Sequence, residues 1–260
     1  MQSPQSSGAV KTITNILITG ASSGLGAALA EQYAGEGVRL ILWGRDEARL
    51  NATAERCREL GATVDVDHFD LRDVDELISR LQARDEQTPV DLAFFNAGIG
   101  GELAKGVSVE TPRRSHEIAM VNIIAPVVSA TVLAQSMTQR KRGHIVLLGS
   151  VAGRYPLPMA PTYSGSKAGL AMFAEALRLQ LMKHDVAVTL VSPGFMDTPM
   201  SQQLHSPTPF MIKAETAAVR IKKKIVRRPA RIIIPWPYAA LDIATRLVPK
   251  AIIGAVLRRF

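Results

Sequence analysis

The stretch Asn15 to Gly26, NILITGASSGLG, decides the fold of this chain. Its apolar run Ile16 to Ile18 is typical of a buried strand and ends at once in a turn that contains Gly20, Gly24 and Gly26. Glycines let a backbone turn sharply and lie close against a ligand, where a Cβ would collide with it. The stretch therefore predicts a first strand that runs into a ligand-binding turn.

A helix is predicted over Gly24 to Glu36, because Leu25, Ala28, Leu29 and Tyr33 share one face at helical spacing. A helix that begins at such a turn directs free amide groups and the positive end of its dipole at the ligand. A pyrophosphate is the natural occupant. The glycine spacing is GxxxGxG rather than the GxGxxG of the common dinucleotide-binding motif. The interpretation as a pyrophosphate site therefore depends on the position of the glycines between strand and helix.

The length and composition fit one α/β domain with a large core: 260 residues, 47% of them hydrophobic. The lone cysteine, Cys57, forms no internal disulfide, and no secretory segment precedes the first strand, so we expect a cytoplasmic location. The histidines are scattered, and no metal site is expected. We expect a flexible tail over residues 1–11, a single catalytic domain over 12–235 and a C-terminal helical extension over 236–260.

Apolar strands alternate with helical segments along the rest of the chain. The expected strands cover 38–43, 63–69, 90–95, 144–148, 186–191 and 231–234. The expected helices cover 46–60, 74–84, 114–138 and 162–183, with a bend in the third at Pro126. This pattern predicts a doubly wound, mostly parallel, seven-stranded Rossmann-type sheet with helices on both faces. Ligands bind such sheets beyond the carboxyl ends of the strands.

Gly44 and Arg45 end the second predicted strand, where an adenosine ribose would lie. A carboxylate there would accept from the ribose hydroxyls of NAD, whereas an arginine is a forked, charged partner for the 2′-phosphate of NADP. Arg45 therefore favours NADP(H). The alternative is a surface arginine beside Asp46, which we expect to cap the next helix.

Asp70 and Leu71 follow the third predicted strand, and Asn96, Ala97 and Gly98 follow the fourth. Asp70 could accept from the adenine amino group, and the small Asn96 to Gly98 turn would let the backbone pass beside a cofactor. Both segments also fit ordinary turns.

Tyr163 and Lys167 lie four residues apart in a predicted helix, so their side chains point the same way. A neighbouring ammonium favours the phenolate, which makes Tyr163 a candidate general acid or base. Ser150, at the end of the fifth strand, could donate a hydrogen bond to a substrate oxygen, and Asn122 could hold a water that leads protons to Lys167. The alternative is a helix face with a snorkelling lysine.

Several motifs follow the order and spacing of a known family: TGASSGLG at 19–26, NAG at 96–98, Asn122, Ser150, YSGSK at 163–167 and PG at 193–194. Over about residues 12 to 235 the chain resembles the short-chain dehydrogenases/reductases. The combination is specific, although no single motif is.

The resemblance implies that Ser150, Tyr163 and Lys167 are a catalytic triad and that Asn122 is its fourth member. Tyr163 and Lys167 would also contact the cofactor, Lys167 through the nicotinamide ribose. The remaining implied cofactor-binding residues are Gly20, Ser22, Ser23, Gly24, Leu25, Gly26, Arg45, Asp70, Leu71, Asn96, Ala97, Gly98, Pro193, Gly194, Met196 and Thr198. Neither Ser22 nor Ser23 supplies the basic residue that many NADP enzymes of the family carry in this turn, so the cofactor preference depends mainly on Arg45.

The implied reaction is hydride transfer between NADP(H) and a carbonyl or secondary alcohol, with Tyr163 moving the proton. Apolar residues in Gly194 to Lys213 and in Val151 to Pro161 suggest an apolar small-molecule substrate. Two alternatives remain: reduction of a thioester-linked 3-oxoacyl chain, and a non-catalytic NADP-binding sensor or scaffold, which the intact triad argues against. The resemblance also implies a homo-oligomer.

The basic character of the chain belongs to its C-terminal part, since residues 213–260 carry 12 Lys and Arg against 2 Asp and Glu. A basic run, Arg220 to Arg231, precedes a mostly apolar segment in which an amphipathic helix is expected from about Tyr238. This extension either lies on an anionic membrane surface, giving a peripheral location on the inner face of a membrane, or packs on the body or a second subunit. No motif that reads nucleic acid is present, and no nucleic-acid partner is expected.

Overall fold

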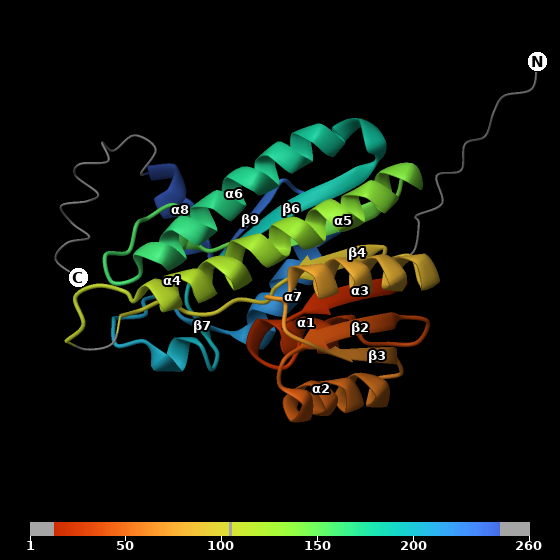
Figure 1. The fold of residues 1–260 in the computed structure, drawn as a ribbon, viewed down its shortest axis with the longest axis horizontal. Helices are drawn as coiled ribbons and strands as arrows, with labels where there is room; N and C mark the ends of the chain where they lie inside the picture. The colour runs from red at the N-terminus through yellow and green to blue at the C-terminus, as the bar shows by residue number, and fades with distance from the viewer. Residues whose placement is uncertain (1–12, 104–105, 245–260) are drawn as a thin grey trace, which may run out of the picture.

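The computed structural model describes residues 13–103 and 106–244. The expectations for the tail 1–11 and for residues 245–260 of the extension lie outside the described residues. Figure 1 shows the described chain as one sheet with helices on both sides.

The central sheet has seven strands in the order β3-β2-β1-β4-β5-β6-β9, and every pairing in it is parallel. Its strands are β1 Asn15–Thr19, β2 Arg39–Gly44, β3 Thr63–His68, β4 Leu92–Phe95, β5 Gly143–Leu148, β6 Val186–Pro193 and β9 Arg231–Ile234. The strand order reverses direction at β1, which has β2 on one side and β4 on the other. The predicted doubly wound Rossmann-type fold is confirmed, and this reversal opens a crevice at the carboxyl ends of β1 and β4.

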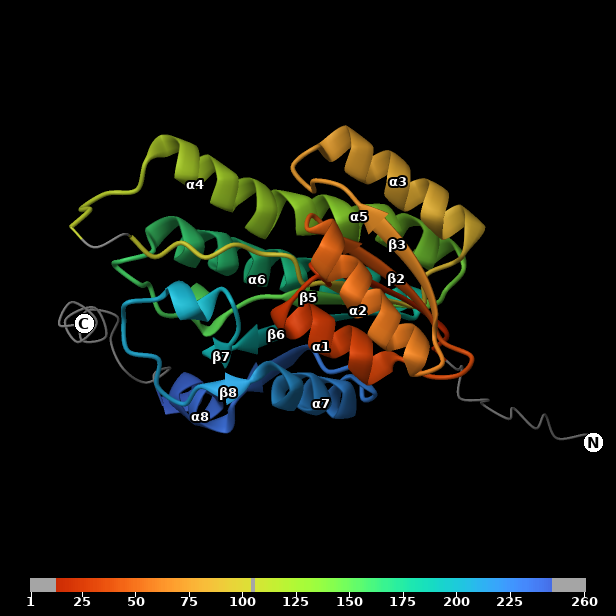
Figure 2. The same ribbon diagram turned by 90° about the horizontal axis from the view of Figure 1, so that it is seen from below.

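Helices cover both faces of the sheet, as Figures 1 and 2 show. One face carries α1 Gly24–Tyr33, α2 Glu47–Glu59 and α7 Ala214–Ile225; the other carries α3 Val74–Gln87, α5 Ala125–Gln139 and α6 Pro161–Leu181. The remaining elements are α4 Pro112–Ala119, the π-helical turn η1 Met120–Ile124, the 3-10 turns η2 Val151–Gly153, η3 Met182–His184 and η4 Ser201–Gln203, the small parallel pair β7 Met196–Asp197 and β8 Ile212–Lys213, and α8 Trp236–Ala244. The apolar cores lie between the helices and the sheet.

The expected bend at Pro126 takes the form of the π-helical turn η1, which joins α4 to α5. Pro126 has no N–H, and its ring crowds the carbonyl four residues earlier, that of Asn122. The wider turn places Asn122 in an irregular part of the helix, a common location for functional residues. The segment Pro112–Gln139 is long and apolar enough to span a membrane, but half of its most apolar window is buried, as in a core helix packed against α3 and α6.

The parallel strands give the sheet two different edges, here called the carboxyl edge and the amino edge. Helix α7 runs back toward the amino edge, where Arg228 pairs with Asp185, the residue before β6, at 3.1 Å. β9 then returns to the carboxyl edge and leads into α8. The basic run Arg220 to Arg231 and helix α8 therefore lie toward opposite edges of the sheet.

The described part of the C-terminal extension packs on the body of the protein. In α8, Tyr238 and Asp242 are 7% and 4% exposed, whereas Trp236 is 75% exposed. Of the two alternatives for the extension, residues 236–244 therefore follow the one in which it packs on the domain.

Candidate active site

The glycine turn between β1 and α1 depends on its glycines for its own packing. Gly20 and Gly24 have φ of +69° and +55°, the left-handed region that favours glycine. A Cβ on Gly26 would lie 2.1 Å from the carbonyl oxygen of Gly20. The sequence suggested that glycine clears space for a ligand, but the contacts that exclude a Cβ here are made within the protein. Ser22 and Ser23 lie in the same turn and Leu25 is the second residue of α1, while their contact with a cofactor stays a prediction.

The N-terminus of α1 has the properties of an anion site. Its N-cap residue, Ser23, makes no side-chain capping hydrogen bond, and its first turn contains no acidic residue. The first amides of a helix have no partner within the helix, so they can donate to a phosphate. The turn therefore fits the pyrophosphate of a dinucleotide.

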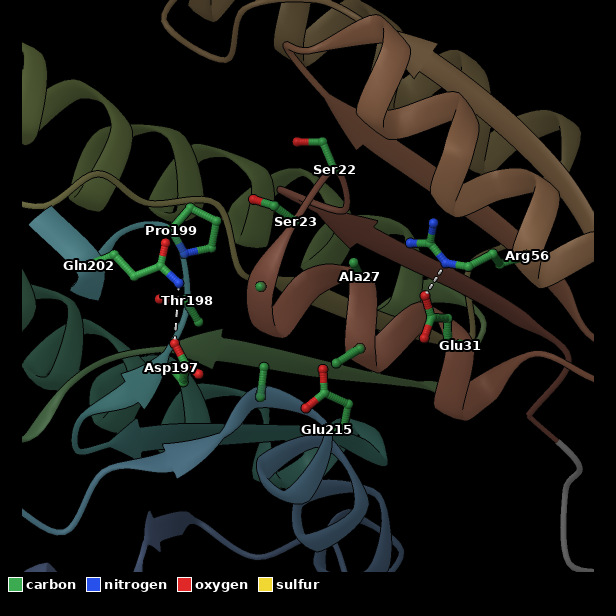
Figure 3. A pocket seen from close by; sticks show the side chains of 13 residues that line it. Ser22, Ser23, Ala27, Glu31, Arg56, Asp197, Thr198, Pro199, Gln202 and Glu215 are labelled. Atoms are coloured by element: carbon green, nitrogen blue, oxygen red, sulfur yellow. Dashed lines mark hydrogen bonds and ion pairs between the residues drawn. The ribbon is translucent and has the colours of Figure 1, made fainter.

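A cleft of about 320 Å³ opens beside this helix end (Figure 3). Ser22, Ser23 and Gly24 line one wall, and the segment from Asp197 to Gln202 lines the opposite wall. A Cβ on Gly24 would lie 3.1 Å from Cγ2 of Thr198, so the two walls nearly touch at this point. Because none of the four catalytic candidates lines the cleft, it belongs to the glycine-turn end of the site.

The end predicted to bind adenosine gathers Arg45, Asp70 and Leu71 beyond β2 and β3. Asp46 caps α2 by accepting from Arg49 N at 2.9 Å, as expected, and Arg45 before it is exposed. Asp70 is already engaged, since Arg72 Nε donates to its Oδ1 at 3.0 Å and to its Oδ2 at 2.9 Å.

These contacts with Arg72 and the nearby charge of Arg45 lower the pKa of Asp70. Sequence reasoning missed Arg72, although its position two residues after Asp70 in a turn was a usable signal. Recognition of adenine by Asp70 stays a prediction.

The Asn96 to Gly98 turn is tied to the end of β1. Thr19 Oγ1 accepts from the backbone N–H of Asn96 at 3.0 Å and of Ala97 at 3.1 Å, and Asn96 Nδ2 donates to the Thr19 carbonyl at 3.1 Å. These bonds fix the Asn96 to Gly98 turn against the carboxyl end of β1. Thr19 is a positioning residue to which the sequence assigned no role.

Ser150, Tyr163 and Lys167 come together beyond β5. A side-chain hydrogen bond joins Ser150 to Tyr163. Lys167 Nζ donates to the carbonyl oxygen of Leu148 at 2.8 Å and lies 5.8 Å from the centroid of the Tyr163 ring. The structure thus brings the three predicted residues into one cluster, and it adds Leu148 as the group that holds the ammonium.

The pKa of Tyr163 departs from its ordinary value in the direction opposite to the one predicted from the sequence. Burial raises the pKa of the phenol, and the hydrogen bond from Ser150 only partly opposes this. Burial also lowers the pKa of Lys167 to about 8. A raised pKa keeps Tyr163 protonated at neutral pH, the form that can donate a proton.

Asn122 is fully buried in η1 and is fixed by the backbone of Ile99. Its Oδ1 accepts from Ile99 N at 2.9 Å, and its Nδ2 donates to Ile99 O at 3.0 Å. A Cβ on Gly98 would lie 3.3 Å from Asn122 Oδ1 and 3.6 Å from Lys167 Nζ. Asn122 and Lys167 therefore approach each other beside Gly98, while the predicted water between them stays a prediction.

The segment after β6 makes two different contacts, one with the glycine turn and one with α8. Thr198 faces the glycine turn, and Met196 belongs to β7. Pro193 ends β6, and the next residue, Gly194, donates its N–H to Ile234 O at 2.7 Å. A Cβ on Gly194 would lie 2.1 Å from Tyr238 Cε2, so Gly194 is required by packing against α8. Sequence reasoning missed this contact, because nothing local links residues 194 and 238.

Among the described residues, no group of three or more His, Cys, Asp or Glu side chains could hold a metal ion. The described part of the site offers uncapped helix amides, an exposed arginine and a hydroxyl–phenol–ammonium cluster. These groups suit a dinucleotide and proton transfer.

Comparisons with known proteins agree with this geometry. The profile of the family "short chain dehydrogenase" matches residues 14–208. An uncharacterized oxidoreductase of Myxococcus xanthus is 35% identical over 245 residues, which cover 94% of this chain and 96% of that protein.

Two solved structures have a similar fold. A short-chain dehydrogenase from Sphingobium yanoikuyae in complex with NADPH has a TM-score of 0.79 at 29% identity, covering 90% of this chain and 94% of its own. A bulky-bulky ketone specific alcohol dehydrogenase from Comamonas testosteroni has a TM-score of 0.76 at 28% identity, covering 90% and 92%.

Proposed function

Because this chain belongs to the short-chain dehydrogenase/reductase family of oxidoreductases, we propose that it transfers hydride between NADP(H) and a carbonyl or secondary alcohol carbon of an apolar small molecule. The observation that carries the proposal is the cluster of Ser150, Tyr163 and Lys167 beyond β5. A phenol bonded to a serine hydroxyl, with a buried ammonium beside its ring, is equipped to donate and recover a proton.

In the reduction direction Tyr163 gives its phenolic proton to the carbonyl oxygen while the carbonyl carbon accepts the hydride. Bound NADPH supplies that hydride. Ser150 donates a hydrogen bond to the same oxygen and stabilises the developing negative charge. Lys167, with a pKa of about 8, can return a proton to the Tyr163 phenolate, whose conjugate acid has a higher pKa. Asn122 keeps the Ile99 backbone in place beside this proton path.

Replacement of Tyr163 by Phe tests the chemistry. We expect kcat to fall by at least about 10³-fold while NADPH binds with unchanged Kd, because the ring stays and only the proton donor is lost. The matched control is Tyr33→Phe, since the buried Tyr33 hydroxyl has no hydrogen-bond partner among the described residues. Normal turnover by Tyr163→Phe would refute the mechanism.

The preference for NADP(H) is proposed from the position of Arg45 after β2 and is supported by the NADPH bound to the Sphingobium enzyme. We expect Arg45→Ala to reduce kcat/KM for NADPH by about 10- to 100-fold and to leave kcat/KM for NADH nearly unchanged. Arg113→Ala is the matched control, because the Arg113 side chain is 92% exposed. If the ratio of kcat/KM for NADPH to kcat/KM for NADH is unaltered in Arg45→Ala, Arg45 does not bind the cofactor.

The proposed apolar substrate rests on the segment 194–213. Met200, Phe210 and Met211 expose 38%, 61% and 40% of their surface there, although a loop on the surface normally carries polar side chains. The similar Comamonas enzyme is described as specific for bulky ketones, which supports the same class. A panel of alkyl and aryl ketones, followed through NADPH absorbance, tests the assignment.

Two other functions receive less support. Docking of an acidic carrier on the basic run would suit a 3-oxoacyl-thioester reductase, but that run ends at the amino edge while Tyr163 lies beyond the carboxyl edge. A non-catalytic sensor would not need Ser150, Tyr163 and Lys167 together.

We further propose a homo-oligomer in the cytoplasm. Three large apolar side chains at i, i+7 and i+10 are exposed along α6 and the start of η3: Met172, Leu179 and Met182, at 70%, 56% and 65%. This stripe can be buried by a second copy, and light scattering of Leu179→Glu tests it.

Cys57 is a free, buried thiol, in keeping with a reducing compartment. Peripheral binding to an anionic membrane stays a prediction, tested by liposome flotation with and without residues 236–260.

A further inference from the structure

Four segments that are distant in sequence meet beside the catalytic cluster beyond β5: residues 99–103, 151–160, 204–210 and helix α8. They gather at the left in Figure 2. Each is joined to two of the others by a specific contact.

The first joint links residues 99–103 to the segment 204–210. Glu102 Oε1 accepts from the backbone N–H of His205 at 3.2 Å, from that of Ser206 at 3.1 Å and from Ser206 Oγ at 2.9 Å. A carboxylate oxygen that accepts three hydrogen bonds holds the two segments firmly. Nearby, a Cβ on Gly100 would lie 3.3 Å from Met200 Cγ, so residues 99–103 also pack against the residue that precedes η4.

The second joint links residues 99–103 to the segment that follows Ser150. The backbone N–H of Leu103 donates to Met159 O at 2.8 Å. One residue before the first joint, a Cβ on Gly101 would lie 2.8 Å from Tyr163 Cβ. The short segment 99–103 therefore lies directly on the proposed proton donor.

The remaining joints are made by α8. The Tyr238 hydroxyl donates to Pro209 O at 2.7 Å, and the Tyr238 and Phe210 rings meet edge to face at 5.9 Å. One helical turn later, Asp242 Oδ1 pairs with Arg154 Nε at 2.5 Å. The Asp242 side chain is 5% exposed and the Arg154 side chain 34%. Breaking an ion pair that contains a buried carboxylate is strongly destabilising, so this contact has a defined geometry.

We propose that these four contacts close a ring around the substrate mouth, in which Glu102, Tyr238 and Asp242 are positioning residues that hold the substrate segment 194–213 over Tyr163. Helix α8 is then a wall of the substrate site. The ring itself is a property of the described structure. Its effect on substrates rests on the proposed oxidoreductase function.

The ring predicts coupling between joints that do not touch each other. In the full-length chain, Asp242→Asn opens the joint with Arg154, and we expect amide exchange at His205, Ser206 and Leu103 to accelerate by about tenfold or more. Amide exchange measured by NMR reports these positions individually. Tyr238→Phe removes only one hydroxyl and should give the same pattern, which keeps the test valid if Asp242→Asn does not fold.

Controls separate coupling from general destabilisation. Glu102→Ala should accelerate exchange at His205 and Ser206, and Glu102→Gln, which keeps an acceptor oxygen, should restore protection. Asp185→Asn breaks an exposed ion pair at the amino edge and should change none of the three amides. If Asp242→Asn and Tyr238→Phe accelerate exchange only within α8 and residues 151–154, the ring proposal is overturned.

Kinetics with two carbonyl probes then test the effect on substrates. With benzophenone, Asp242→Asn and Tyr238→Phe should raise KM by about fivefold or more while kcat and the Kd for NADPH change less than twofold, since the reacting groups are untouched. With 4-nitrobenzaldehyde, a smaller probe, the change in KM should be smaller. An equal fall in kcat for both probes would contradict a positioning role. If none of the carbonyl compounds tested supports NADPH oxidation by the wild type, the proposed function fails. The amide-exchange result still decides whether the ring exists.

Discussion

The two edges of the one parallel sheet use polar residues in different ways. At the amino edge, carboxylates are paired with arginines and backbone amides: Asp85 with Arg140 at 2.6 Å, and Asp91 with Arg142 at 2.8 Å. Asp91 also accepts from Thr14 N at 2.9 Å. These contacts join strand starts and helix ends, so this edge contributes stability.

At the carboxyl edge, the candidate catalytic side chains are instead held by neutral hydrogen-bond partners and are available to a ligand. Asn122 and Lys167 bond to backbone oxygens or amides, not to opposite charges, and Ser150 and Tyr163 bond to each other. The fold thus keeps the four catalytic candidates out of ion pairs, whereas Asp85 and Asp91 at the amino edge are each paired with an arginine. Substitutions at the two edges should therefore separate stability from activity.

The largest expected effect is at the carboxyl edge. Ser150→Ala removes the hydroxyl that bonds to Tyr163 and should lower kcat/KM by about 10²- to 10³-fold, or about 3–4 kcal/mol of transition-state stabilisation. The thermal midpoint should change little, because Ser150 is partly exposed. Steady-state kinetics and calorimetry on the same preparation measure both. If Ser150→Ala lost much stability and kept a normal kcat/KM, the predicted separation of activity at the carboxyl edge from stability at the amino edge would be wrong.

The converse is expected at the amino edge for Asp85→Asn. Asp85 is buried, accepts from Val90 N at 2.8 Å and pairs with Arg140. Loss of its charge should lower the free energy of unfolding by about 3 kcal/mol, measured by urea denaturation. At temperatures where the variant is folded, kcat/KM should equal that of the wild type. A drop in kcat/KM of folded Asp85→Asn would contradict the separation.

A smaller effect concerns pH and the buried His144 at the start of β5. Burial lowers the pKa of His144 to about 3, from 6.5. Between these values the unfolded chain binds a proton that the folded chain does not, so stability falls as pH decreases from about 6.5 toward 3, by at most about 1.4 kcal/mol per pH unit. His144→Asn should reduce this slope, whereas the same change at the exposed His184 should not. Equal slopes in urea denaturation for all three proteins would exclude His144 as the source.

The smallest effect is expected for the exposed pair of Arg228 and Asp185, whose side chains are 44% and 61% exposed. Asp185→Asn should change the free energy of unfolding by less than about 1 kcal/mol, because solvent screens the pair. Asn also tolerates the left-handed backbone of this position, φ +53°. If urea denaturation shows that the free energy of unfolding changes by more than about 2 kcal/mol, the contribution of an ion pair at the amino edge does not follow its burial.

The order of the seven strands and of the helices up to α6, the parallel sheet and the cluster of Ser150, Tyr163 and Lys167 were predicted from the sequence, whereas helix α7 was not. Strand and helix periods are local, and parallel strands necessarily bring their carboxyl ends to one edge. The spacing of four between Tyr163 and Lys167 is fixed by a single helix. Such features need no knowledge of distant contacts.

Only the tertiary structure decided the environment of those residues. The pKa of Tyr163 is raised where the sequence suggested that Lys167 would lower it, because burial outweighs the hydrogen bond with Ser150, and burial depends on every segment packed around the ring. Asp242, in the segment for which the sequence predicted an amphipathic helix, turns inward to Arg154. Packing between segments far apart in the chain carries no local signature, so burial, pKa and the walls of the substrate mouth follow from the folded molecule alone.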